Sequence, residues 1–237
     1  MQLIRDREFL DGPQHNRQLI ADYVLENCTF DGWAGLTPNW SNSDPSLRPT
    51  IRNVTLRNTN AYSAYLEGVI IEDVTVDTTK AGKAPLFLRG NAYRHVTLKG
   101  RIGNTEIRGK MFPSLELHMQ EQERIKAAWD RANAVYYETV DWALDITQAT
   151  YGSLSISGVP AKLIRRNPDN TAVVTRDLAL GGQWQNLPYK SGLFKVVLSW
   201  LVDDGYDDVV LIACPRSKRY KEDLDDLQLL RDSGVAE

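Results

Sequence analysis

The sequence predicts a mixed β and α+β protein, in which a short solenoid of strand-bearing repeats is followed by a long helix and an α+β domain. Three observations support this prediction. A short apolar phrase recurs in the first half, an amphipathic stretch follows it, and strand and helix patterns alternate in the C-terminal part. The expected boundaries place the repeats in 1–112, the helix in 113–139 and the α+β domain in 140–237.

The motif that recurs in the first half consists of an apolar residue, a threonine and a second apolar residue. Its copies are centred on Thr29, Thr55, Thr75 and Thr97. Such alternation predicts a strand with two side chains facing the interior and one facing outward. The threonines lie 26, 20 and 22 residues apart, and repetition at such a period predicts a solenoid in which each repeat forms one coil.

Polar residues precede each threonine at fixed distances. Three positions before it, the charge alternates along Glu26, Arg52, Glu72 and Arg94. Coils stacked in this register would place opposite charges on neighbouring strands, where they attract. Two positions before it stand Asn27, Asn53, Asp73 and His95. Because Asn and Asp favour bends, we expect them to stack inward at one corner of the coils, with the histidine interrupting the stack near its end.

The stretches ENCTFDG, RNVTLRN and EDVTVDT resemble the coils of right-handed parallel β-helices with the pectin-lyase-like architecture. The resemblance covers roughly residues 20–110 and implies a short right-handed parallel β-helix in the N-terminal half. Members of that architecture include polysaccharide lyases and hydrolases, phage tailspikes and non-catalytic proteins. The resemblance therefore implies a shape rather than one activity.

The second half contains helix and strand patterns in place of the repeat. Residues 114–139 predict an amphipathic helix with Ser114 as its N-cap, placed to cover the open end of the coils. Strands are expected at 140–146, 153–158, 161–167, 171–177 and 208–214, with a hairpin turn at 167–170. Helices are expected at 192–205, ending at a glycine, and at 217–234.

The composition excludes several classes of function. The net charge of −3 provides no overall basic field to attract nucleic acid. No apolar run approaches the length of a membrane span, and the N-terminus lacks the apolar segment of a signal peptide. Cys28 and Cys214 are far apart in the sequence, which favours a reducing cytoplasm. No His or Cys spacing typical of a metal site occurs, so no cofactor is expected.

The candidates for catalysis are Asp141, Asp145 and Cys214. The two aspartates share the polar face of an expected strand, where they could hold Mg²⁺, or they form a solvated face. The order of elements around them resembles the restriction-endonuclease-like nuclease core, but the paired acid and lysine of that family are missing. Cys214 ends an expected buried strand and precedes the basic start of an expected helix. Helix N-termini and neighbouring cations lower the pKa of a thiol and activate it. Alternatively, Cys214 is a buried structural cysteine.

The candidates for binding are Trp40, in the loop 34–49, and the basic cluster of Arg216, Lys218 and Arg219. The cluster could bind a phosphate, a nucleic acid or an acidic partner. Alternatively, it pairs with the acidic residues of 222–226 on a solvated helix.

The function that we expect is non-catalytic macromolecular recognition or assembly in the cytoplasm, as an inhibitor, an immunity-type partner or a scaffold. Another protein is the expected partner, and no membrane is involved. Such a module should expose an aromatic patch, with Trp40, Tyr62 and Tyr65 as candidates. One alternative is a metal-dependent nuclease that uses the acidic residues of the α+β domain. A second is a carbohydrate-binding or carbohydrate-cleaving β-helix.

Overall fold

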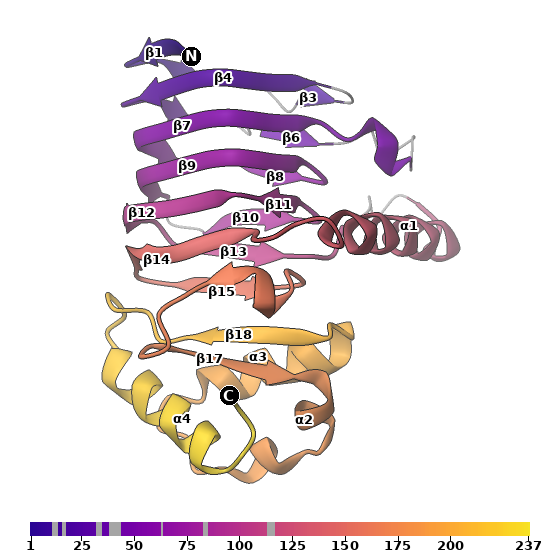
Figure 1. The fold of residues 1–237 in the computed structure, drawn as a ribbon, viewed down its shortest axis with the longest axis vertical. Coiled ribbons are helices and arrows are strands. Elements are labelled where there is room, and N and C mark those ends of the chain that lie inside the picture. The colour runs from indigo at the N-terminus through magenta and orange to yellow at the C-terminus, as the bar shows by residue number, and fades with distance from the viewer. Residues whose placement is uncertain are drawn as a thin grey trace.

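The computed structural model of the chain describes residues 1–10, 14–15, 18–31, 35–37, 44–62, 64–82, 85–112 and 117–237. In these residues it is a β-rich α+β protein with two large sheets and four α-helices. The strands of both sheets run across the long axis of the molecule, one below the other (Figure 1).

The first sheet consists of strands in parallel pairing. In spatial order these are β1 (Gln2–Arg5), β4 (Leu19–Glu26), β7 (Thr50–Ala61), β9 (Ile70–Ala81), β12 (Val96–Ile102), β14 (Leu144–Tyr151) and β16 (Ile164–Arg165). Shorter strands pair alongside them, namely β2 (Glu8–Phe9), β5 (Thr29–Phe30) and β11 (Ala92–Arg94).

The second sheet begins with parallel strands and ends with antiparallel ones. The parallel strands are β3 (Gln14–His15), β6 (Gly35–Thr37), β8 (Tyr65–Glu67), β10 (Leu86–Arg89), β13 (Thr105–Arg108) and β15 (Leu154–Ser157). β18 (Asp208–Ile212) then pairs antiparallel with β15, and β17 (Thr171–Thr175) pairs antiparallel with β18.

The chain alternates between the two sheets. β7, β9 and β14 belong to the first sheet, and β8, β10 and β15, which follow them in the chain, belong to the second. A large apolar cluster built from both sheets lies between them. This arrangement is compatible with a parallel β-helix-like fold. Strand pairing also runs through the expected boundary at residue 139, because β14 pairs with β12.

The expected alignment of the repeats is right for three copies and wrong for the first. Thr55 lies beside Thr75, and Thr75 beside Thr97. Thr29, however, lies beside Asn60, five positions further along β7 than expected. Accordingly, Arg52 and Arg94 both pair with Glu72, whereas Glu26 aligns with Arg57 and pairs with Arg5.

The misalignment arises because β7 and β9 each contain two bends with positive φ. The first bend is formed by a row of residues with positive φ, here called the first corner row: Asp22, Asn53, Asp73 and His95. A second row with positive φ contains Asp6, Asn27 and Asn58, continued by Thr78 and Gly100. Asn27 belongs to this second row and bonds Asn58, not Asn53. Asn and Asp tolerate this conformation at little cost, which explains why they recur there.

The corner residues also face differently from the expectation. Asn53 and Asp73 are exposed on the surface, not stacked in the interior. Asn53 Nδ2 donates to Asp22 Oδ1 at 2.6 Å, so the first corner row is joined through its own side chains. His95 does not interrupt the row, since its φ is 54° and its Nδ1 lies 3.0 Å from Asp73 Oδ1.

The long helix α1 (Met119–Tyr137) begins after His118, and the expected N-cap, Ser114, lies outside the described residues. The helix projects from one side of the stack of strands and does not cross its end (Figure 1). Trp129 anchors it there, because this fully buried ring packs against Gly68 at the end of β8. Gly68 has a positive φ, and an added Cβ would lie 2.9 Å from the ring.

The C-terminal helices form a second apolar cluster against β17 and β18. They are α2 (Arg176–Leu180), α3 (Leu193–Asp204), which ends at Gly205 as expected, and α4 (Tyr220–Asp232). The expected hairpin at 167–170 is wrong, because β16 pairs with β14 in the first sheet and β17 pairs with β18 in the second. Short 3₁₀ turns cover Pro45–Leu47, Ala161–Leu163 and Gln183–Asn186.

Candidate recognition surface

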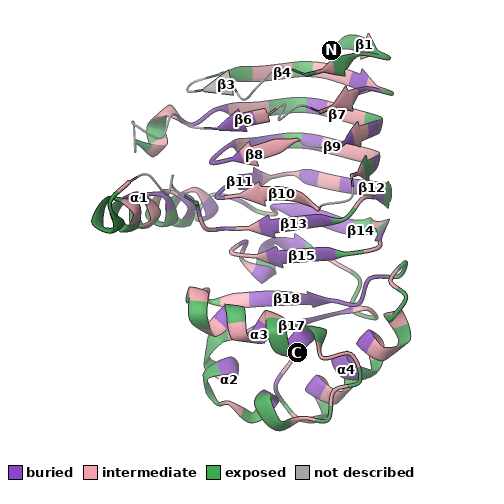
Figure 2. Cartoon of the chain, turned by 180° about the vertical axis from the view of Figure 1, so that it is seen from behind, coloured by how far each residue is buried: buried purple, intermediate pink, exposed green. Residues whose placement is uncertain are grey.

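The outer face of the second sheet carries two rows of large side chains across β8, β10 and β13. Leu66, Leu88 and Ile107 face the interior, so the residues on either side of them face outward. The first outward row is Tyr65, Phe87 and Glu106, and the second is Glu67, Arg89 and Arg108. Figure 2 shows this sheet toward the viewer, with β8 and β10 partly exposed.

Arg89 lies between two aromatic rings. Its Cζ atom is 4.9 Å from the centre of the Phe87 ring and 4.6 Å from that of Phe112. The Phe112 side chain is 53% exposed, although its backbone is held firmly, because Phe112 N donates to Glu67 Oε1 at 2.7 Å. A guanidinium between two rings gains a favourable electrostatic interaction from each, which orders all three side chains.

Arg108 extends the same pattern to helix α3. Its Cζ lies 4.5 Å above the Trp200 ring, and its Nε pairs with Glu106. Trp200 remains 39% exposed and shares one side of α3 with Val196 and Leu193, which are also exposed. Spacings of three and four residues place these three on one helix face.

We define the aromatic–arginine surface as the residues that these contacts bring together: Tyr65, Phe87, Arg89, Arg108, Phe112 and Trp200. It is contiguous although its members come from β8, β10, β13, the segment after β13 and α3. Lys110 continues it, since its Nζ lies 5.5 Å from the centre of the Tyr206 ring.

Glu67 lies beneath this surface. Its side chain is fully buried, and its Oε2 has no hydrogen-bond partner among the described residues. Burial raises the pKa of Glu67 to about 7, while the bond from Phe112 N and the charge of Arg89 act in the opposite direction. The carboxyl group thus holds the backbone of Phe112 in place at the cost of its own desolvation.

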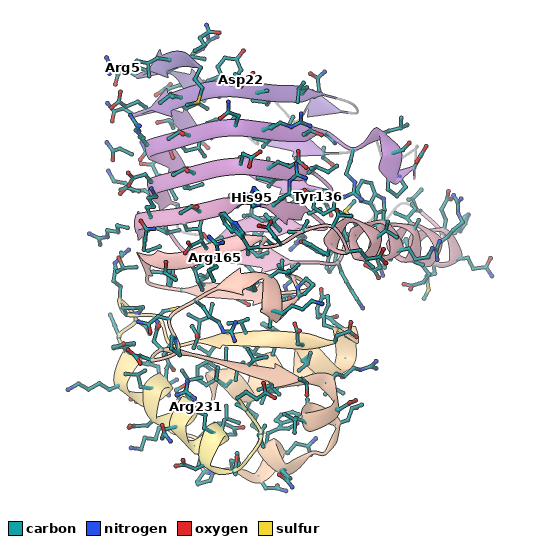
Figure 3. The ribbon with its side chains drawn as sticks, viewed as in Figure 1. Arg5, Asp22, His95, Tyr136, Arg165 and Arg231 are labelled. Atoms are coloured by element: carbon teal, nitrogen blue, oxygen red, sulfur yellow. The ribbon has the colours of Figure 1, made fainter. Side chains whose placement is uncertain are left out.

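On the opposite sheet, Asp141 extends the first corner row. His95 Nε2 lies 2.7 Å from Asp141 Oδ1, and the His95 ring packs against Trp142 with centres 4.8 Å apart. Arg165 lies on the same indole, with Cζ 4.1 Å from its ring centre. Figure 3 shows Asp22, His95 and Arg165 following one another down the face of the first sheet.

The hydrogen bond between His95 and Asp141 shifts the pKa of both side chains. The hydrogen bond to Asp141 is the largest effect and raises the pKa of His95. Burial opposes it, and the bond to Asp73 and the charges of both carboxylates restore the net rise. The hydrogen bond from His95 lowers the pKa of Asp141. Both shifts favour the ion pair of imidazolium and carboxylate.

A second polar cluster lies beside this row at Glu72. This nearly buried carboxylate accepts from Arg52 Nε at 3.0 Å and from the Tyr136 hydroxyl at 2.9 Å, and Arg94 lies 3.2 Å away. Tyr136 comes from the end of α1 and is labelled in Figure 3. Because all the carboxylate's neighbours are donors, the cluster fixes α1 to the first sheet.

Asp145, the second expected metal ligand, is engaged elsewhere. It is buried within β14, and its Oδ1 accepts from both the backbone N and the hydroxyl of Thr147, at 2.9 and 2.6 Å. Asp141 precedes the strand and turns toward His95. In the part of the chain that the structure describes, no group of three or more His, Cys, Asp or Glu side chains is placed to hold a metal ion.

Cys214 follows β18 and lies in the apolar cluster between the sheets. Leu154 N donates to its Sγ at 3.2 Å. Burial raises the pKa of the Cys214 thiol to about 11, which keeps it protonated at neutral pH. A nucleophilic cysteine has the opposite shift.

The basic cluster divides among different partners. Arg219 Nε bonds Glu222 at 2.7 Å, and its Nη2 bonds the carbonyl of Lys190 at 2.9 Å. Arg216 donates from Nη1 to the carbonyl of Ile102 at 3.4 Å. Burial and then the charge of Arg101 lower the pKa of Arg216, and Lys218 is exposed. Bonds at the start of α4 and to Lys190 thus account for Arg219, while Arg216 and Arg101 form a basic pair that the sequence does not indicate.

The aromatic residues expected to bind a partner have different outcomes. Trp40 lies outside the described residues, and Tyr62 is 45% exposed at the end of β7. Tyr65 belongs to the aromatic–arginine surface, as do five residues that sequence reasoning did not select. A signal for two of them was present, because LFLR at 86–89 alternates so that Phe87 and Arg89 share one face.

Among the helices in the described ranges, none combines the length and apolarity needed to cross a membrane. Comparisons with protein-family models, with curated proteins and with solved structures find no match to this chain.

Proposed function

We propose that this protein is a cytoplasmic, non-catalytic recognition module that binds another protein through the aromatic–arginine surface. One observation carries the proposal: Arg89 and Arg108 are each held against exposed aromatic rings, at 4.6 Å from Phe112 and 4.5 Å from Trp200. Aromatic residues and arginine are the types most enriched at the energetic centres of protein interfaces.

The surface has the rigidity that a binding site needs. Phe87, Arg89 and Arg108 project from paired strands, and the hydrogen bond from Phe112 N to Glu67 Oε1 fixes the backbone of Phe112. Side chains that are ordered before binding lose less conformational entropy when a partner docks. Two guanidinium groups among rings favour a partner segment that combines carboxylates with apolar side chains.

We further propose that the scaffold is a short right-handed parallel β-helix. The alternation of the chain between parallel sheets and the two rows of positive φ support this, since each coil would turn at the same positions as its neighbours. Repeated coils present strands of equal spacing, which suits a flat binding face.

The test is affinity capture from a native extract, followed by measurement of binding with the purified partner. The double variant Phe112→Ala/Trp200→Ala should weaken binding by more than about thirtyfold, equivalent to at least about 2 kcal/mol, as expected for two interface centres. Leu180→Ala is the matched control, because Leu180 is 57% exposed on α2 and outside the surface. A partner that the double variant binds with unchanged affinity would overturn the proposal.

The carbohydrate alternative uses the same exposed rings, since aromatic side chains beside strands can also stack on sugars. A glycan array separates the two, because a carbohydrate-binding module would retain a glycan that Phe112→Ala/Trp200→Ala releases. The nuclease alternative is tested by incubation with DNA and RNA, with Mg²⁺ or chelator, beside Asp141→Ala/Asp145→Ala. Metal-dependent cutting that this variant loses would replace the recognition proposal.

A further inference from the structure

A cavity of about 470 Å³ lies between the two sheets in the N-terminal half of the stack. Its lining extends from Ile4 and Phe9, on β1 and β2, to Ile107 and Leu144, on β13 and β14. The strands that line it follow one another along the long axis of the molecule (Figure 1), so the lining residues extend along that axis. The volume lies within the range of small-molecule sites and is about three times that of an engineered apolar cavity that binds benzene.

The chemistry of the lining suits an apolar occupant. Among the described residues that line it, none is charged, and nearly all are Ile, Leu, Val, Ala or aromatic. The polar side chains among these described residues are three threonines and two tyrosines. Thr59 Oγ1 donates to Thr79 Oγ1 at 3.3 Å, Thr105 Oγ1 donates to the Gly103 carbonyl at 2.9 Å, and the Tyr93 hydroxyl accepts from Asn91 Nδ2 at 3.3 Å. Water needs two to four polar partners to occupy a cavity, so a lining with so few polar groups favours an apolar occupant over water.

Side chains that face this space keep accessible surface. Leu56 and Val76 on the first sheet, and Leu66 and Leu88 on the second, line the cavity and are only partly buried. By contrast, Val210 faces the same apolar cluster beyond the cavity and is 3% exposed. Protein interiors are normally packed without voids of this size, and an empty apolar volume destabilises a fold in proportion to its size.

The guanidinium of Arg7 lies at the N-terminal end of the cavity. Phe9 and Phe30, which both line it, stack with ring centres 5.1 Å apart. The guanidinium of Arg7 lies over Phe9, with Cζ 5.5 Å from the ring centre, and is exposed. An anionic head group at this end would meet a positive charge while its chain remained among apolar side chains.

We propose that the cavity binds the alkyl chain of a fatty acid, with the carboxylate at the N-terminal end beside Arg7. The chain replaces empty volume along β4, β7 and β9, where the partly buried leucine and valine side chains gain contacts. This site is separate from the aromatic–arginine surface, because Leu66 and Leu88 face inward from the strands that carry Tyr65 and Phe87 outward.

The test is a titration of the full-length, lipid-free protein with hexadecanoate, followed by native mass spectrometry and by thermal unfolding. One bound molecule per chain and a rise of several degrees in the unfolding midpoint are expected, because a ligand that binds only the folded state stabilises it. Lipid-free protein that binds no hexadecanoate would overturn the proposal.

Two matched variants distinguish a filled cavity from a damaged core. Val76→Phe should fill the cavity, raise the unfolding midpoint without ligand and weaken hexadecanoate binding by more than about tenfold. Val210→Phe makes the same change at a packed position and should lower the midpoint by overpacking. If Val76→Phe lowers the midpoint as much as Val210→Phe, or binds hexadecanoate normally, the cavity site is wrong.

The position of the carboxylate has its own test. Arg7→Gln should weaken binding of hexadecanoate severalfold and leave binding of hexadecanol unchanged, because only the acid carries the charge that Arg7 would meet. Equal affinities of wild type and Arg7→Gln for hexadecanoate would overturn the proposed orientation.

Discussion

His95 Nε2 lies 2.7 Å from Asp141 Oδ1, although 46 residues and the whole of α1 separate the two in the chain. His95 directly precedes β12, and Asp141 lies shortly before β14, the strand that pairs with β12 after the chain has passed through α1. The other imidazole nitrogen is 3.0 Å from Asp73. The histidine therefore joins the strands on either side of the inserted helix.

This bridge predicts that stability depends on pH through His95. Its pKa is raised from 6.5, so its contribution is complete below about pH 6.5 and is lost as the pH rises through the higher folded value. The pKa of Asp141 is lowered from 3.8, so its contribution is present above about pH 3.8 and is lost as the pH falls through the lower folded value. The bridge should be strongest between these limits.

The measurement compares wild type with His95→Asn, since asparagine tolerates the positive φ of this position. In urea unfolding, the variant should lose more stability at about pH 5.5 than at about pH 9, because the imidazolium is present only in the first case. A difference of equal size at both pH values would contradict an ion pair.

Glu67→Gln should stabilise the protein at alkaline pH. The folded pKa of about 7 lies above the unfolded value of 4.5, so the wild type loses stability as the pH rises from 4.5 through 7. At about pH 8.5 the variant should be more stable by about 2 kcal/mol. It avoids burying a charge, and this gain is reduced because the NH₂ group of the new side chain is left without a hydrogen-bond partner. At about pH 4.5 the two proteins should differ by less than about 1 kcal/mol. Thermal unfolding at both pH values checks this, and a variant that is less stable at both would refute it.

Asn53→Ala should destabilise the fold more than Asn53→Gly. Both variants lose the 2.6 Å bond to Asp22, but only alanine also places a Cβ in the left-handed region, where φ is 52°. The expected cost is about 2 kcal/mol for alanine and about 1 kcal/mol for glycine. Denaturant unfolding of the pair distinguishes corner geometry from hydrogen bonding, and equal costs would show that the φ value is unimportant.

Glu72→Gln should cost more than Glu26→Gln. The Glu72 side chain is 8% exposed and is paired with Arg52, Arg94 and the Tyr136 hydroxyl. Replacing its charge weakens all of these interactions, so Glu72→Gln should lower the free energy of unfolding by about 2 kcal/mol. Glu26 pairs with an arginine that is 60% exposed, and such surface pairs contribute about 0–1 kcal/mol. Urea midpoints measured at low and high salt provide the comparison, and the Glu26 pair should be the more sensitive to salt. An equal loss of stability in the two variants would mean that burial does not strengthen the interactions of Glu72.

The candidate site illustrates which relationships are local. Phe87 and Arg89 share a face because strand side chains alternate, and the sequence LFLR contains that information. The contact between Arg108 and Trp200 joins a strand to a helix some ninety residues later, and nothing near either residue specifies it. The same is true of Arg101 beside Arg216, and of the cavity, which depends on the spacing of two sheets.

The sequence by itself determined the elements that short-range chemistry controls. Alternating apolar residues around Thr55, Thr75 and Thr97 specify strands that stack in register, and Gly205 ends α3 in the left-handed conformation. Tertiary structure alone decided which of two similar bends aligns with its neighbours, so that Asn27 lies beside Asn58 and not Asn53. It also decided that β16 and β17 join different sheets. The physical reason is that a bend motif specifies only its own φ angles, whereas its partner is selected by the hydrogen bonds and apolar burial of the whole stack.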